Sequence, residues 1–192
     1  MKFLDAILGR TKPKQANLDA LFAVPGAAIT LETAVGLRPA GAAAVCFRPA
    51  SGQDFAATQV EIDELLALAA KETGAVVSQS QDSYGYHWIV VRDPDLEDVV
   101  TSAHMVNATL AERGFGPQLL ASVFPFRSDD GRVAHLVYLF KRGTFYPFAP
   151  APGGGERRDN QLELQVQAAI GGEVPLEEDL SRWFPIWGAP VP

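Results

Sequence analysis

The sequence predicts an α+β fold, with a single domain whose mixed or mainly antiparallel sheet of about five to six strands carries helices on one face. Two observations predict this class. Strand-like segments follow one another in runs, without the strict strand–helix alternation of a doubly wound parallel sheet. The chain has 192 residues, and a chain of this length buries roughly 70% of its unfolded surface in one core.

The N-terminal part is expected to divide at residue 16. Residues 1–16 are predicted to form a short amphipathic helix and a basic linker, and residues 17–192 a single α+β domain with an aromatic C-terminal tail. A short helix is expected over 18–22, before Pro25 and Gly26 interrupt the helical pattern. A further helical turn is expected over 30–35.

The first strand is predicted over 41–48. Ser51 and Asp54 resemble a capping box at the start of a long helix that Gly74 closes. Two paired strands then follow, over 75–81 and 84–92, rich in β-branched and aromatic residues.

A second long helix is expected to begin at Asp93-Pro94, because aspartate favours the N-cap and proline the first helical position, and to end at Gly114. Strands over 119–127 and 133–141 form the clearest hairpin. The second of these is apolar on both faces, which predicts a central strand. Asp159 is expected to cap a third helix.

Composition limits the functions that the chain can have. Its net charge is −7 and its pI about 4.9, which disfavours nucleic-acid binding, because neutralising phosphates requires clustered basic residues. The single Cys46 cannot form an internal disulfide and is typical of a protein of the reducing cytoplasm. No apolar run approaches the roughly 18–20 residues that span a bilayer.

The start of the chain reverses the overall charge. Residues 1–14 hold four basic side chains and one acidic, a net charge of +3, and apolar residues share one helical face. Such a segment is typical of a tether to an anionic membrane or a partner; packing on the domain is the alternative. The candidate tether residues are Lys2, Phe3, Leu4, Ile7, Leu8, Arg10, Lys12 and Lys14.

Catalytic and metal-binding patterns are weak. The three histidines, His87, His104 and His135, lack metal-ligand spacing, and no GxSxG motif appears. Cys46 with a histidine is a conceivable dyad, but its apolar neighbours predict burial. The acidic run at 177–179 is expected to be a solvated turn. We therefore predict no enzyme activity, no cofactor and no metal.

Aromatic residues gather in two places. In the stretch 140–150, basic residues alternate with aromatics, which favours packing into the core over nucleobase stacking, with a protein-binding groove as a third possibility. The tail is expected to fold back onto the sheet, with docking on a partner as the alternative. The candidate partner-binding residues are Phe145, Tyr146, Phe148, Trp183, Phe184 and Trp187.

The whole chain resembles the PspA-associated protein PspAB family of phage-shock systems. The likeness is carried, in order, by FLDAILGRTKPK, NLDALF, GLRPAG to VCFRP, YGYHWIVVRDPDLEDVV, GFGPQLLASVFPFR, VYLFKRGTFYPFAP, RRDNQLELQ and DLSRWFPIWGAP. The resemblance implies a cytoplasmic accessory protein of the envelope-stress response. Its implied partner is PspA, an elongated helical protein that coats stressed membranes.

Three functions follow from these observations. The first is a non-enzymatic adaptor that binds PspA or its membrane assemblies. The second is a peripheral membrane protein at the inner face of the cell membrane, acting through the basic N-terminus without contacting PspA. The third, which the residue patterns favour least, is an unrecognised enzyme using Cys46 or a histidine.

Overall fold

The computed structural model describes residues 17–192, so the predicted N-terminal helix and tether lie outside the described residues. The helices are η1 (Leu18–Ala23), α2 (Val24–Val35), α3 (Gln53–Thr73), α4 (Leu96–Leu110), η2 (Ala111–Phe115), η3 (Gly116–Gln118), α5 (Asn160–Ile170) and η4 (Leu180–Arg182). The strands are β1 (Arg38–Pro39), β2 (Ala42–Phe47), β3 (Val76–Gln81), β4 (His87–Arg92), β5 (Leu119–Arg127), β6 (Val133–Leu139) and β7 (Thr144–Phe148).

The strands form one antiparallel sheet in the order β3-β4-β2-β5-β6-β7, and the short β1 pairs with β5 beside this row. The hairpin β5–β6 pairs Arg127 with Val133 around the predicted turn, and β6 lies between β5 and β7 as expected for a strand apolar on both faces. The predicted α+β class is therefore confirmed.

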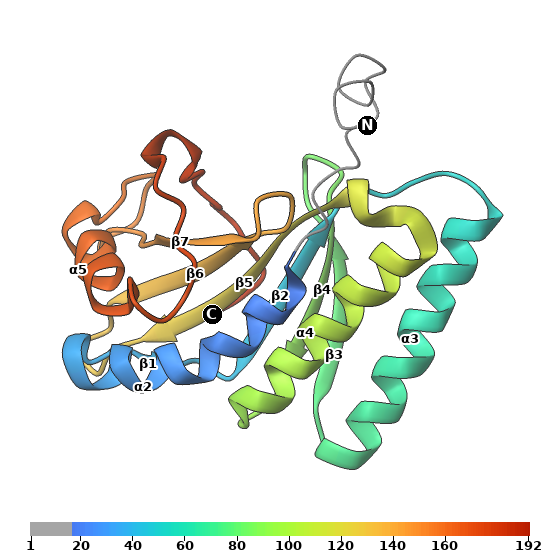
Figure 1. Ribbon diagram of the computed structural model, residues 1–192, viewed down its shortest axis with the longest axis horizontal. Helices are drawn as coiled ribbons and strands as arrows, with labels where there is room; N and C mark the ends of the chain where they lie inside the picture. Colours follow the sequence, from blue (N-terminus) through green and yellow to red (C-terminus); the bar gives the residue numbers. More distant parts are fainter. Residues whose placement is uncertain (1–16) are drawn as a thin grey trace, which may run out of the picture.

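The helices cover one face of the sheet. Helices α2, α4 and α3 lie side by side across it (Figure 1), and α5 packs against α2 and β7. Their apolar side chains share one core with alternate strand residues, because successive residues of a strand point to opposite faces. This core includes Leu21, Val24, Leu31, Phe55, Ile62, Val100, Val106, Phe124, Leu136, Phe145, Leu162 and Ile170.

The C-terminal tail covers the opposite face. A second apolar cluster joins the other side chains of β2, β4, β5, β6 and β7 to Trp183, with Ile186, Trp187, Ala189 and Val191 packed against it. The tail therefore folds back onto the sheet, as the sequence favours. This second cover explains why the central strands are apolar on both faces.

Three helix boundaries differ from the sequence predictions. Pro25 does not end a helix but lies in the first turn of α2, where its missing N–H costs no hydrogen bond. Helix α3 begins after Gly52 without a side-chain cap, so the prediction of a capping box at Ser51 and Asp54 is wrong. Helix α4 is capped by Asp95, whose side chain accepts from Glu97 N, and not by Asp93.

One stretch of the described chain, Leu18–Val35, is long and apolar enough to cross a membrane by length and composition alone. The expectation that no such stretch exists is therefore wrong. Here, however, the stretch is split between η1 and α2, and Leu21, Val24 and Leu31 are buried in the helical core. Packing against the sheet and neighbouring helices accounts for these buried residues, whereas Phe22 and Ile29 of the same stretch are exposed.

Candidate functional site

A groove of about 710 Å³ lies between the sheet and the C-terminal tail. Its floor comes from the sheet face opposite the helices, one wall from residues 184–187, and one end from the β6–β7 turn. The lining residues are Cys46, Asp82, Tyr84, Tyr86, Trp88, Leu120, Ala121, Leu139, Lys141, Arg142, Tyr146, Arg182, Phe184, Pro185, Ile186 and Trp187.

The floor of the groove is one row of side chains that crosses four strands. Trp88 pairs with Cys46, Cys46 with Ala121, and Ala121 with Leu139. The two small side chains lie in the middle of the row and the two large ones at its ends, so the middle is hollow. A bulge between β2 and β5 adds Leu120 to this face, since Phe47 pairs with Leu119 while Cys46 pairs with Ala121.

Hydrogen bonds fix the wall segment at both ends. The Tyr146 hydroxyl donates to Phe184 O over 2.8 Å, and an Arg92 guanidinium N–H donates to Pro190 O over 3.3 Å. Arg158, paired with the buried Glu163, donates to Trp183 O. The segment between these points is therefore held across the sheet face.

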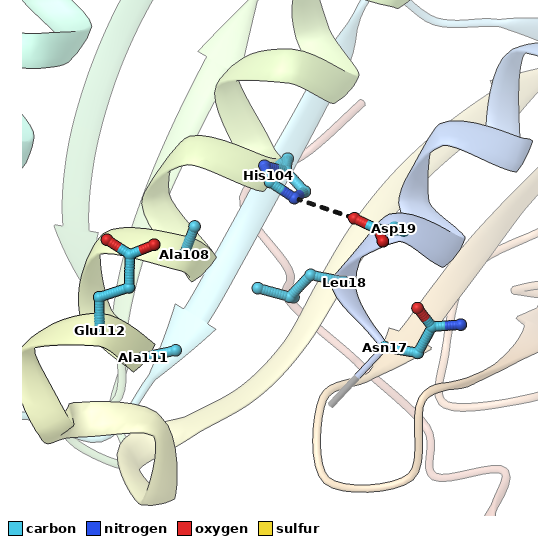
Figure 2. A pocket seen from close by; sticks show the side chains of 7 residues that line it. All are labelled: Asn17, Leu18, Asp19, His104, Ala108, Ala111 and Glu112. Atoms are coloured by element: carbon cyan, nitrogen blue, oxygen red, sulfur yellow. Dashed lines mark ion pairs between the residues drawn. The ribbon is translucent and has the colours of Figure 1, made fainter. Parts of the chain in front are cut away.

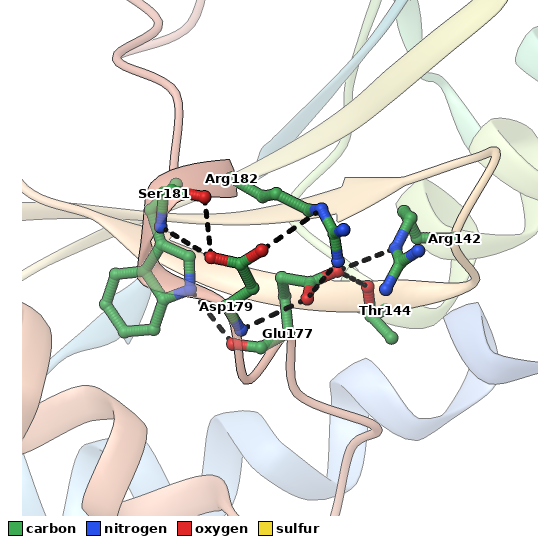
Figure 3. A network of polar contacts seen from close by, with 7 residues as sticks. Arg142, Thr144, Glu177, Asp179, Ser181 and Arg182 are labelled. Atoms are coloured by element: carbon green, nitrogen blue, oxygen red, sulfur yellow. Dashed lines mark hydrogen bonds and ion pairs between the residues drawn. The ribbon is translucent and has the colours of Figure 1, made fainter.

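The basic end of the groove is organised around a buried carboxylate, Glu177 (Figure 3). Its two oxygens lie 2.9 Å from Arg142 Nε and 3.4 Å from Arg182 Nη1, and Thr144 donates to it over 3.1 Å. Burial alone would raise the pKa of Glu177, but hydrogen bonds from Arg142, Asp179 N and Thr144, together with the Arg142 charge, lower it. The prediction of a solvated turn is thus wrong at Glu177.

At the other end of the groove, Asp82 accepts three hydrogen bonds. They come from Tyr84 N, Tyr86 N and, over 2.9 Å, Trp88 Nε1. Although burial opposes ionisation, these donors lower the pKa of Asp82. Asp82 is therefore a structural anion that orients the Trp88 indole at the edge of the floor.

The Cys46 thiol, which the sequence offers as a conceivable nucleophile, lies in the floor of the groove. Burial, with a smaller contribution from the Asp82 charge, raises its pKa to about 12. The thiol is therefore protonated near neutral pH, whereas a nucleophilic cysteine requires the thiolate.

The three histidines do not converge on Cys46. His87 packs its ring against Phe47, whose side chain belongs to the helical core, whereas Cys46 belongs to the cluster under the tail. His104 lies on α4, and His135 lies near the far end of β6, where its Nε2 is 3.4 Å from Pro192 O. Within residues 17–192, no group of three or more His, Cys, Asp and Glu side chains is placed to hold a metal ion.

A second, smaller cavity of about 280 Å³ lies between η1 and α4. Figure 2 shows His104 and Asp19 facing each other across it, with the His104 Nε2 4.0 Å from an Asp19 oxygen. Because the Asp19 side chain is 91% exposed, this contact is open to water. The groove under the tail is therefore the better candidate site.

The predicted partner-binding aromatics do not form one exposed surface, because four of the six are buried: Phe145, Tyr146, Phe148 and Trp183. Phe145 points into the helical core and Tyr146 to the other face, as strand alternation requires. Phe184 is 57% exposed and Trp187 half-buried, and both line the groove. Partner binding at these two residues stays a prediction.

The packing interpretation of the stretch 140–150 agrees with the structure. Its aromatic side chains are buried, while Lys141 and Arg142 are exposed at the groove. Sequence reasoning missed Leu120, Ala121 and Leu139 as groove residues. Their apolar character was visible in the sequence, but the strand register that lines them up with Cys46 was not.

Comparison with known proteins identifies the family of this chain. No curated protein and no solved structure matches it. The family model of PspAB, PspA associated protein B, matches residues 1–191. The match covers both the described domain and the basic N-terminal segment that lies outside it, and agrees with the resemblance carried by the sequence motifs. The chain therefore belongs to the PspA associated protein B family.

Proposed function

We propose that the protein is a non-enzymatic accessory protein of the PspA envelope-stress response, and that it binds PspA or its membrane assemblies. The family match over residues 1–191 carries the proposal, because the family name associates its members with PspA. We place the protein in the cytoplasm, peripheral at the inner face of the cell membrane, where PspA assemblies would be accessible to it.

The chemistry of the described domain favours binding over catalysis. The buried Cys46 thiol is protonated near neutral pH, and the histidines lie on separate elements. Apolar side chains at the groove, above all Phe184, instead offer a contact surface, because aromatic residues and arginine are enriched in protein interfaces.

Co-purification with the PspA of the same organism tests the proposal. Intact protein is expected to retain PspA at physiological salt, and so is a variant lacking residues 1–14 if the folded domain carries the contact. Phe184→Ser should reduce retention, whereas Leu164→Ser, at an equally exposed leucine on α5, should not. Failure of the intact protein to retain PspA, with or without vesicles, would contradict direct binding.

A second candidate is peripheral membrane binding through the N-terminus without PspA. The +3 charge of residues 1–14 on an acidic chain favours it, because each basic residue near an anionic membrane adds about 1 kcal/mol. Intact protein is expected to sediment with anionic vesicles and not with neutral ones. If deletion of residues 1–14 left that sedimentation unchanged, the N-terminus would not be the membrane contact.

A further inference from the structure

We infer that the groove under the tail is a binding site for a single-chain anionic amphiphile. The hydrocarbon chain would lie along the apolar floor, and the acidic head group beside Lys141, Arg142 and Arg182. This inference goes beyond the proposed function, because it assigns a small-molecule ligand and does not depend on contact with PspA.

The size and lining of the groove suit such a ligand. Its volume of about 710 Å³ falls within the range of roughly 300–1,000 Å³ that is typical of small-molecule sites. Apolar side chains dominate the lining, and the charged ones stand at the ends. The apolar members include Cys46, Trp88, Leu120, Ala121, Leu139 and Ile186.

The shape of the floor suits an extended chain. The row from Trp88 to Leu139 crosses β4, β2, β5 and β6, which is a span of about 14 Å at the usual spacing of strands. Cys46 and Ala121 leave the middle of this row low, so the floor is a trough. The fixed segment 184–187 forms its wall, so the apolar surfaces are positioned before the ligand binds.

Charge is distributed unequally between the two ends. Glu177 pairs with Nε of Arg142 and with Nη1 of Arg182, and Asp179 pairs with Nε of Arg182 over 3.4 Å. Both terminal nitrogens of Arg142 and Nη2 of Arg182 therefore stay available to a ligand. Lys141 has no ion pair with any residue of 17–192 and is exposed. These groups favour an anionic head group at the β6–β7 end. The opposite end carries Asp82, whose oxygens accept hydrogen bonds from within its own hairpin.

A head-group comparison on the intact protein tests the inference. Laurate, dodecanol and dodecylammonium share a chain length, and each would be titrated below its micelle concentration while tryptophan fluorescence and heat are recorded. Trp88 and Trp187 line the groove, so a saturable fluorescence change is expected with laurate. Non-specific adsorption would favour the cation, because the protein carries a net charge of −7. Tighter binding of laurate than of both analogues supports the basic site; equal or tighter binding of either analogue overturns it.

A series of fatty acids of different length distinguishes burial of the ligand's hydrocarbon chain from a purely ionic contact of its head group. From decanoate to laurate to myristate, each buried methylene is expected to tighten binding about fourfold. Affinity that does not change along the series would mean that the hydrocarbon chain stays outside the groove, which would overturn the proposed site.

Two variants locate the ligand. Ala121→Phe fills the hollow of the floor and should weaken laurate binding at least tenfold. Lys141→Glu should weaken laurate binding about fivefold and leave dodecanol unchanged, while Lys71→Glu on α3 serves as the matched charge control. Thermal unfolding verifies that each variant folds. If Ala121→Phe does not fold, the head-group comparison on the intact protein decides whether the groove prefers an anionic amphiphile. Unaltered laurate binding in folded Ala121→Phe would overturn the inference.

Discussion

Cys46 lines the groove and Glu177 holds two of the arginines that line it, and the surroundings of these two residues shift their pKa values in opposite directions. Burial dominates at Cys46 and raises its pKa to about 12. At Glu177, hydrogen bonds and the Arg142 charge outweigh burial and lower the pKa. The difference arises because Glu177 has donors around it, whereas Cys46 has apolar neighbours and the negative Asp82.

The reactivity of Cys46 follows from its raised pKa. In the folded protein at pH about 8, iodoacetamide is expected to react with this thiol at least tenfold more slowly than in the unfolded chain, because the thiolate fraction is small and the thiol is buried. Mass spectrometry of the alkylated protein over time measures both rates. Equal rates in the folded and unfolded states would show an accessible, ionised thiol.

Replacing Glu177 by glutamine removes the anion between two guanidiniums. We expect Glu177→Gln to lower the free energy of unfolding by about 1–3 kcal/mol at neutral pH, less than for a fully enclosed pair because both arginines reach water. Denaturant unfolding measures it, with the exposed neighbour Glu178→Gln as control.

The pH dependence of this effect has a defined sign. Because the folded-state pKa of Glu177 is lowered, its stabilisation is complete above the unfolded value of about 4.3 and is lost as pH falls through the folded value. The stability difference between Glu177→Gln and the unmodified protein should therefore shrink in acid. A difference that grew in acid would contradict the ion-pair explanation.

At the scale of elements, replacing a glycine by alanine is expected to change stability in opposite directions at two positions, because their backbone conformations differ. Gly41 has φ +64°, and a Cβ there would meet Asp93 O at 3.0 Å, whereas a Cβ at Gly26 in α2 meets nothing within 4 Å. Gly41→Ala is expected to destabilise by about 1–3 kcal/mol. Gly26→Ala should stabilise by up to about 1 kcal/mol, because alanine favours the helix. Thermal unfolding of both variants checks this, and a shared sign would contradict it.

The tail contributes to stability through Trp183 and not through its neighbour. The Trp183 side chain is buried, stacks near Tyr146 and donates from Nε1 to Glu177 O over 3.0 Å. Trp183→Ala is therefore expected to cost about 3–5 kcal/mol. Phe184→Ala should stay within about 0.5 kcal/mol, since Phe184 is 57% exposed. Similar losses in both variants, measured by denaturant unfolding, would mean that the tail is packed differently.

At the scale of the whole molecule, helices cover one face of the sheet and the tail covers the other. His135 is buried in β6 on the tail side, where its Nε2 meets Pro192 O. Protonation of this histidine would place a charge between sheet and tail. Acid should consequently destabilise the packing of the C-terminal tail on the sheet and, with it, the folded domain as a whole.

Burial lowers the pKa of His135 to about 4, against about 6.5 in an unfolded chain. Because the unfolded state binds the proton first, stability should fall as pH drops from about 6.5 towards 4, by up to about 1.4 kcal/mol per pH unit. His135→Gln is expected to flatten this slope in urea unfolding measured across that range. An equal flattening in His104→Gln, on α4, would show that burial of His135 is not the cause.

Local patterns predicted most of the elements. The strand over 41–48, the hairpin around residues 128–131, the glycine that ends α3 at Gly74 and the Asp159 cap all agree with the structure. The start of a helix was harder to predict. Before α4, Asp93 and Asp95 both suit the N-cap position, and Pro94 suits the first helical position after Asp93. Aspartate at 95 is the residue whose side chain actually caps α4.

By itself, the sequence determined the α+β class and the family, because these depend on periodicity, turn residues and motif order, and it favoured a folded-back tail over docking on a partner. Only the tertiary structure decided the groove and the state of Glu177. The floor depends on a register that aligns Cys46 with Ala121, and the ion pairs join residues 35 and 5 positions apart. Such contacts are set by packing across distant segments, which local patterns do not encode.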